Sequence, residues 1–105
     1  QGEIQFVAVL RCSPKELEAR YSKRGYSEKK IKDNILSEIL DICFADALCS
    51  FGSNAIAEFD TTERQPNDIA KDIKLVWSGN MKRSHGMINW ISKIPPEDLI
   101  KNYLG

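Results

Sequence analysis

The chain has 105 residues, of which 42% are hydrophobic and 29% charged, and its formal net charge is zero. This size and composition predict one folded domain with a modest core, and they argue against a disordered chain. No apolar run approaches the roughly 20 residues of a membrane span, and the N-terminal residues lack the basic and apolar regions of a signal peptide.

The first predicted element is a buried strand. Residues 4–10 form a nearly continuous apolar run, which is typical of a parallel strand covered on both faces. Ser13 follows as an N-cap, Pro14 occupies the first helical position, and Glu16 completes a capping box. The sequence therefore predicts a central strand of an α/β sheet, followed by a helix over residues 14–23.

A second, longer helix is predicted over residues 28–48. Gly25 suits the left-handed position that ends the first helix, and Ser27 suits the N-cap of the next one. We interpret the apolar residues that recur at helical spacing as packed core. They are Ile31, Ile35, Leu36, Ile39, Leu40, Cys43, Phe44 and Ala47.

A short strand over residues 55–60 and a helix over residues 66–78 come next. The helix carries Ile69, Ile73 and Trp77 at a spacing of four, which predicts one buried face. Because helices separate the two strands, the strands should lie parallel through a right-handed crossover.

The tail after Gly79 is less regular. Residues 80–86 form a basic turn, residues 87–94 are apolar and include Trp90, and a short helix restarts at Pro95. We expect this tail to dock on the sheet.

The three cysteines, Cys12, Cys43 and Cys49, show no CxxC spacing and lie in apolar stretches. We interpret them as buried, reduced thiols of a cytoplasmic protein. His85 is the only histidine and has no acidic or cysteine neighbour at metal-ligand spacing, so we expect neither a metal centre nor Cys/His catalysis.

The junction between the first two helices is strongly basic. Six basic residues stand against Glu28 alone between positions 20 and 32. Such a run is often a solvated helix face, but at a helix-to-helix junction of a neutral chain it indicates an anionic partner. The basic residues are Arg20, Lys23, Arg24, Lys29, Lys30 and Lys32.

A wider pattern includes this junction. Its first part consists of Val9, Leu10, Arg11, Leu17, Glu18, Arg20, Arg24, Gly25, Tyr26, Glu28, Lys29, Lys30, Asp33, Asn34, Glu38 and Ile39. The pattern continues through residues 59–62 and reaches residues 87–91. It resembles the CINAP family, the adenylate kinase-type P-loop proteins of archaeal and eukaryotic ribosome assembly.

The resemblance implies an α/β fold in which residues 1–105 form the lid-containing C-terminal half of a P-loop nucleotide-kinase sheet with flanking helices. The first strand would be the fourth of five parallel strands, and residues 20–34 would form a helical lid over the phosphates. A phosphate loop of the form G-x-x-x-x-G-K-[ST] occurs nowhere in the chain, and neither does the apolar strand whose terminal acidic residue would organise Mg²⁺ in such a family. We therefore expect this chain alone to be inactive, with ATP and Mg²⁺ implied by the family and the Mg²⁺ ligands supplied elsewhere.

The same resemblance suggests site residues. Arg20 and Arg24 would be catalytic, because guanidinium groups bind phosphate oxygens in bidentate geometry. Lys29 and Lys30 are weaker phosphate-binding candidates. A loop beside the adenine or ribose would contain Thr61, Thr62, Glu63 and Arg64, although Gln65 before Pro66 departs from the family pattern.

Two functional hypotheses follow. In the first, the chain is the lid and base-loop half of an adenylate kinase or ATPase that converts ATP and AMP into two ADP, with an implied role in maturation of the small ribosomal subunit and a small-subunit ribosomal protein as partner. In the second, it is a non-enzymatic module that contacts a ribosomal protein or RNA through the basic junction. The first strand would have an unpaired edge, so we expect it to bind the missing P-loop half or a second copy of the chain.

Overall fold

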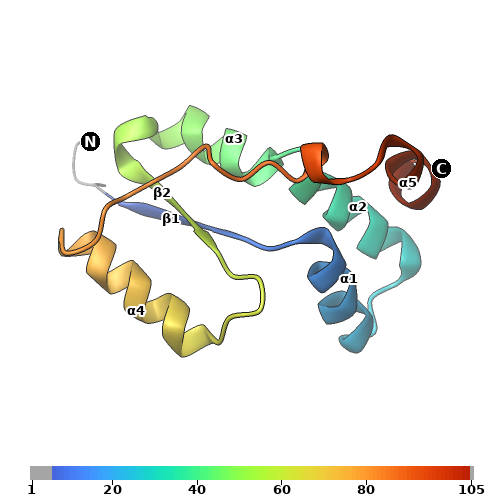
Figure 1. The fold of residues 1–105 in the computed structure, drawn as a ribbon, viewed down its shortest axis with the longest axis horizontal. Coiled ribbons are helices and arrows are strands. Elements are labelled where there is room, and N and C mark those ends of the chain that lie inside the picture. Colours follow the sequence, from blue (N-terminus) through green and yellow to red (C-terminus); the bar gives the residue numbers. More distant parts are fainter. Residues whose placement is uncertain (1–5, 105) are drawn as a thin grey trace.

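The computed structural model describes residues 6–104, and Figure 1 shows their arrangement. Two strands, β1 (Val7–Arg11) and β2 (Ile56–Asp60), form a parallel sheet in which Val7 lies opposite Ile56. The α/β class and the parallel pairing are confirmed. Residues 4 and 5 of the predicted first strand lie outside the described residues. The helices are α1 (Pro14–Lys23), α2 (Glu28–Ile39), α3 (Ile42–Phe51), α4 (Pro66–Trp77) and α5 (Pro96–Leu99), which leads into a π-helical turn, Ile100–Leu104.

Helices α3 and α4 flank the strand pair on opposite sides, and the α1–α2 hairpin extends from the carboxyl end of β1 (Figure 1). The sheet order is β1–β2, so within the described part of the chain β1 has a partner strand on one side only. No helix within residues 6–104 is long and apolar enough to cross a membrane.

The predicted capping signals around α1 and α2 are largely confirmed. The Ser13 hydroxyl accepts a hydrogen bond from the Glu16 amide, and the Ser27 hydroxyl accepts one from the Lys30 amide. Gly25 has a φ of 77°, the left-handed conformation that glycine adopts without steric cost. The capping box is only half formed, because the Glu16 carboxylate binds Arg20 rather than the amide of Ser13.

The predicted continuous helix over residues 28–48 is wrong. Helix α2 ends at Ile39, Asp41 takes a left-handed conformation with a φ of 59°, and α3 begins at Ile42. The Asp41 carboxylate accepts a hydrogen bond from Arg11 Nη2 at 2.5 Å. Aspartate tolerates the left-handed conformation better than most residues. The helix can therefore break at Asp41, and at this break its carboxylate pairs with Arg11.

The main apolar cluster lies on α2 rather than on the sheet. Ile31, Ile35 and Ile39 form the predicted stripe, and Trp90 of the tail packs against them. The expectation that the tail docks on the sheet is therefore wrong for most of its length. Figure 1 shows the tail running from the end of α4 across to α2. Its contact with β2 is at Glu58, whose amide donates to the Ser84 carbonyl and whose carboxylate accepts from the Gly86 amide.

Several residues predicted to be core are exposed. Cys12 is buried, but Cys43 and Cys49 are exposed, because the break at Asp41 takes α3 out of the stripe of α2. Trp77 is 71% exposed, whereas Ile69 on the same helix is buried. The prediction of three buried thiols is therefore wrong for two of them.

Candidate functional site

A cavity of about 910 Å³ lies at the carboxyl end of the strands, and the α1–α2 hairpin and α4 form its walls. This edge is where ligands bind in open parallel α/β sheets. Its polar lining includes Arg20, Arg24, Asn34, Glu38, Thr61 and Arg64. The cavity therefore joins the basic junction to the segment after β2.

Arg20 is held at the wall of this cavity by two contacts. Its Nη2 atom donates to the Glu16 carboxylate one helical turn earlier and to the Thr61 carbonyl at 3.3 Å. Its side chain remains 38% exposed. Arg20 is thus positioned against β2, but its charge is shared with Glu16.

Arg24 lines the cavity from the C-terminus of α1. Its backbone amide donates to the carbonyls of Arg20 and Tyr21, which fixes the position of the residue. Within residues 6–104 its guanidinium forms no ion pair. Among the described residues, therefore, no carboxylate competes with an anionic ligand for the five N–H donors of the Arg24 guanidinium.

The structure does not bring Lys29 and Lys30 to the cavity lining. Lys29 Nζ lies 3.0 Å from the Asp33 carboxylate on the exposed side of α2. Lys30 Nζ lies 4.6 Å from the centre of the Tyr26 ring, a cation–π contact. The charges of both lysines are engaged on the outer surface of the hairpin.

Of the two threonines in the predicted base loop, only Thr61 lines the cavity. Thr61 is buried at the cavity, and its hydroxyl donates to the Arg11 carbonyl at 2.8 Å. Thr62 is outside the lining, and its hydroxyl accepts from the Ser13 amide and donates to Asp60. Both threonines therefore tie the end of β2 to the end of β1.

Arg64 lines the cavity but is paired. Its Nη1 atom lies 2.6 Å from the Asp72 carboxylate, and this hydrogen bond raises the pKa of Arg64. Glu63, beside it, has a φ of 56°, and its amide donates to the Glu16 carboxylate. Glu16 thus connects α1 to the loop after β2.

An ion cluster in the wall of the cavity, centred on Arg11, was not predicted from the sequence. The Arg11 side chain is 1% exposed and lies 2.5 Å from each of three carboxylates. Burial by itself would lower the pKa of Arg11, but hydrogen bonds to the carboxylates raise it above the usual value. The carboxylates belong to Glu38, Asp41 and Glu58, and they hold Arg11 permanently charged.

Glu38 is the central acceptor of this cluster. One of its oxygens, Oε2, accepts from Arg11 Nε, from the Cys12 amide and from Trp90 Nε1. A sequence signal for this role exists, because Glu38 lies three residues after Ile35 on the buried side of α2. Glu58, in turn, interrupts the apolar strand β2.

Two further observations concern the chemistry of the site. Cys12 lines the cavity, and burial raises the pKa of its thiol, with a further rise from Glu16 opposed by Arg20. The described residues contain no group of three or more His, Cys, Asp or Glu that could hold a metal ion. Residues 6–104 therefore do not form a Mg²⁺ site of that kind.

Comparison with known proteins gives related sequences in archaea. The chain is 36% identical over 88 residues to a protein of Halobacterium salinarum, a match that covers 84% of this chain and 52% of the relative. It is 34% identical over 88 residues to a protein of Methanocaldococcus jannaschii, covering 84% of this chain and 46% of the relative. A Pyrococcus furiosus protein is 33% identical over 84 residues, covering 80% of this chain and 46% of the relative.

Each of these relatives carries the name "Putative adenylate kinase". The chain spans about half the length of the relatives it matches. No protein-family model matches the chain. The similarity therefore relates this chain to adenylate kinase-like proteins over about half of their length.

Proposed function

We propose that residues 1–105 are the lid-containing C-terminal portion of a P-loop nucleotide kinase of the CINAP type. Joined to a P-loop portion, this unit transfers the γ-phosphoryl group of ATP to a phosphate oxygen of AMP, giving two ADP. The observation that carries the proposal is the convergence of Arg20, Arg24 and Arg64 on one cavity at the carboxyl end of parallel strands. The similarity to relatives with an adenylate kinase name supports the same reaction class.

Arg24 is the principal phosphate-binding residue in this proposal, because its guanidinium is unpaired within residues 6–104. Arg20 assists by exchanging its contact with Glu16 for a phosphate oxygen. Both arginines stabilise the charge that spreads over the transferring group, which is how arginine contributes to phosphoryl transfer.

The remaining candidates have supporting roles in the proposal. Thr61 and Arg64, which line the cavity, contact the adenine or ribose, and Thr62 holds their loop in position. Lys29 and Lys30 approach the phosphates only when the α1–α2 hairpin closes over the nucleotide. ATP is the phosphoryl donor, and the Mg²⁺ that accompanies it takes its protein ligands from outside this chain.

The P-loop portion is proposed to extend the sheet beside β1. Leu10 of β1 is 54% exposed, and the described residues leave one side of this strand without a partner strand. Helix α3 is largely apolar yet has no buried residue. A further layer of sheet and helix would cover both surfaces.

By its resemblance we also assign the complete protein a cytoplasmic role in rRNA processing and small-subunit maturation, with a small-subunit ribosomal protein as partner.

The test is a fusion of this chain, at Gln1, to the N-terminal portion that precedes the matched segment in the Pyrococcus furiosus relative. ADP formation from ATP and AMP is measured for the fusion and for its Arg24→Ala variant. We expect activity in the fusion and a loss of about 10² to 10³-fold in kcat for the variant. Lys15→Ala, an exposed change on α1 outside the cavity lining, should leave activity unchanged. A folded fusion that binds ATP but forms no ADP would contradict the proposal and favour the binding-module alternative.

A further inference from the structure

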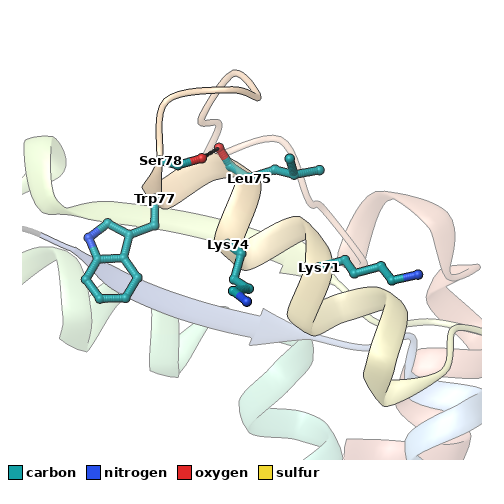
Figure 2. Close-up of a pocket in the computed structure, with 5 residues that line it drawn as sticks. All are labelled: Lys71, Lys74, Leu75, Trp77 and Ser78. Atoms are coloured by element: carbon teal, nitrogen blue, oxygen red, sulfur yellow. Dashed lines mark hydrogen bonds between the residues drawn. The ribbon is translucent and has the colours of Figure 1, made fainter.

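The outer face of α4 forms a second candidate binding surface, which is separate from the arginine cavity. Lys71, Lys74 and Trp77 are exposed on this helix, whereas Ile69 faces the core. Together with Leu75 and Ser78 they line a shallow cavity of about 650 Å³. Figure 2 shows these five side chains around the C-terminal half of α4, with the Ser78 hydroxyl bonded to the Leu75 carbonyl. We call this surface the α4 patch.

Trp77 is the most unusual member of the α4 patch. Its side chain is 71% exposed, although tryptophan usually buries most of its large ring. The ring stacks on Phe6 with an interplanar angle of 2° and a centroid separation of 6.2 Å. This contact orients the indole from one side, and within residues 6–104 most of the Trp77 side chain is accessible to solvent.

The charged side chains that line the α4 patch have one sign. They are Lys71 and Lys74, and the described lining contains no acidic residue. Asp72, which lies between these lysines in the sequence, is paired with Arg64. Neither Lys71 nor Lys74 forms an ion pair with any other residue between positions 6 and 104. The α4 patch therefore suits an anionic partner.

We propose that the α4 patch binds single-stranded nucleic acid. One unpaired base stacks on the exposed indole of Trp77, and flanking phosphates contact Lys71 and Lys74. Aromatic stacking beside a positively charged groove is the general mode of single-strand recognition. A duplex would offer phosphates but keep its bases stacked inside, and an acidic peptide would engage the lysines while leaving the indole unused.

The spacing of these residues fits a short stretch of strand. Lys71 and Trp77 are six positions apart on one helix, which corresponds to about 9 Å along its axis. Lys82 follows in the turn after α4 and can contact a further phosphate. The α4 patch shares no lining residue with the arginine cavity, so the two sites are separable by mutation.

The test uses the 105-residue chain and a fluorescein-labelled 12-nucleotide oligouridine, with binding followed by fluorescence anisotropy. We expect the logarithm of the observed association constant to fall with the logarithm of salt concentration with a slope of about −2. Each phosphate contact of Lys71, Lys74 and Lys82 contributes about 0.7 to this slope. Trp77→Ala should weaken binding about tenfold, and Trp77→Phe should retain most of the affinity. Lys71→Gln combined with Lys74→Gln should make the slope shallower by about 1.4. Tryptophan fluorescence should be quenched on binding in the parent chain, because Trp77 is exposed while Trp90 is 6% exposed.

Matched controls separate this site from the basic junction. Arg24→Ala and Lys29→Gln should bind the oligonucleotide like the parent chain. An affinity that depends on Arg24 but not on Trp77 would overturn the proposal and assign the binding to the junction. Equal affinity for duplex RNA, or full competition by polyglutamate, would also overturn it. Circular dichroism of each variant establishes that folding is retained, as expected for exposed positions.

Discussion

The indole Nε1 of Trp90 donates a hydrogen bond to Glu38 Oε2 at 2.8 Å and so joins the tail to α2 across 52 positions of the chain. The same carboxylate oxygen accepts from Arg11 Nε at 2.5 Å, at the end of β1. Glu38 therefore connects the strand, the hairpin helix and the tail through one buried charge.

Trp90→Phe should destabilise the chain by about 1.5–3 kcal/mol, because hydrogen bonds to charged groups contribute this much and the smaller ring fills less of the cluster. Urea unfolding measures the change. Trp77→Phe is the matched control on an exposed tryptophan and should change the free energy of unfolding by less than about 0.5 kcal/mol. Equal effects at the two positions would show that the bond to Glu38 contributes little.

Arg11→Met should be among the most damaging single changes. It preserves an unbranched side chain of similar length but leaves the carboxylates of Glu38 and Glu58 buried without their cation. Removing one partner of a buried ion cluster costs about 3–5 kcal/mol. Lys29→Met, which removes an exposed pair with Asp33, should have little effect in the same urea experiment. A mild effect of Arg11→Met would mean that solvent reaches the cluster.

Substitutions at Asp41 test why the helix breaks between α2 and α3. Asp41→Gly keeps the left-handed backbone accessible but loses the contact with Arg11, whereas Asp41→Ala loses the contact and strains the backbone. We expect the alanine variant to be less stable than the glycine variant by about 1 kcal/mol. Thermal unfolding of the two variants gives the comparison. An alanine variant as stable as the glycine variant would indicate that α2 and α3 have merged into one helix.

The Cys12 thiol should make stability depend on alkaline pH. Burial raises its pKa above the usual value of 9.0, so the folded state holds the proton more tightly than the unfolded state. Below pH 9 both states are protonated and stability is unaffected, and as pH rises from 9 towards the folded pKa the unfolded state is increasingly favoured. The urea midpoint should therefore fall above about pH 9, and Cys12→Ala should lose part of this fall.

Tyr103 contributes to the same pH range and needs its own control. Burial also raises the pKa of its hydroxyl, with Glu18 and Asp98 adding to the rise, so Tyr103→Phe should remove a further part of the fall above about pH 10. Thiol labelling provides an independent check, since Cys43 and Cys49 are exposed and should react quickly. Rapid labelling of all three cysteines in the folded chain would contradict the burial of Cys12.

Within residues 6–104 one side of β1 has no partner strand, which predicts association of the isolated chain. Unpaired strand edges are templates for pairing with another chain. We expect size-exclusion chromatography to show dimers or larger species at micromolar concentration. Leu10→Lys places a charge at this strand and should shift the chain towards the monomer. A clean monomer for the parent chain would contradict the prediction.

Short-range features were predicted well because they depend on neighbouring residues. The bounds of α1, the caps at Ser13 and Ser27, and the left-handed Gly25 follow from local hydrogen bonding and backbone freedom. The parallel pairing of β1 and β2 follows from two apolar runs separated by helices. The sequence also located the basic junction at the hairpin, where Arg20 and Arg24 border the cavity.

By itself, then, the sequence determined the caps, most of the helix bounds, the strand pair and the position of the basic residues. Tertiary structure alone decided the break at Asp41, the exposure of Cys43 and the path of the tail to α2. Each of these depends on a contact across many positions, above all the ion pairs of Arg11 with partners 27 to 47 residues away. Helical periodicity does not indicate which buried charges will form ion pairs. The cost of burying Arg11 is offset only when folding brings its carboxylate partners together.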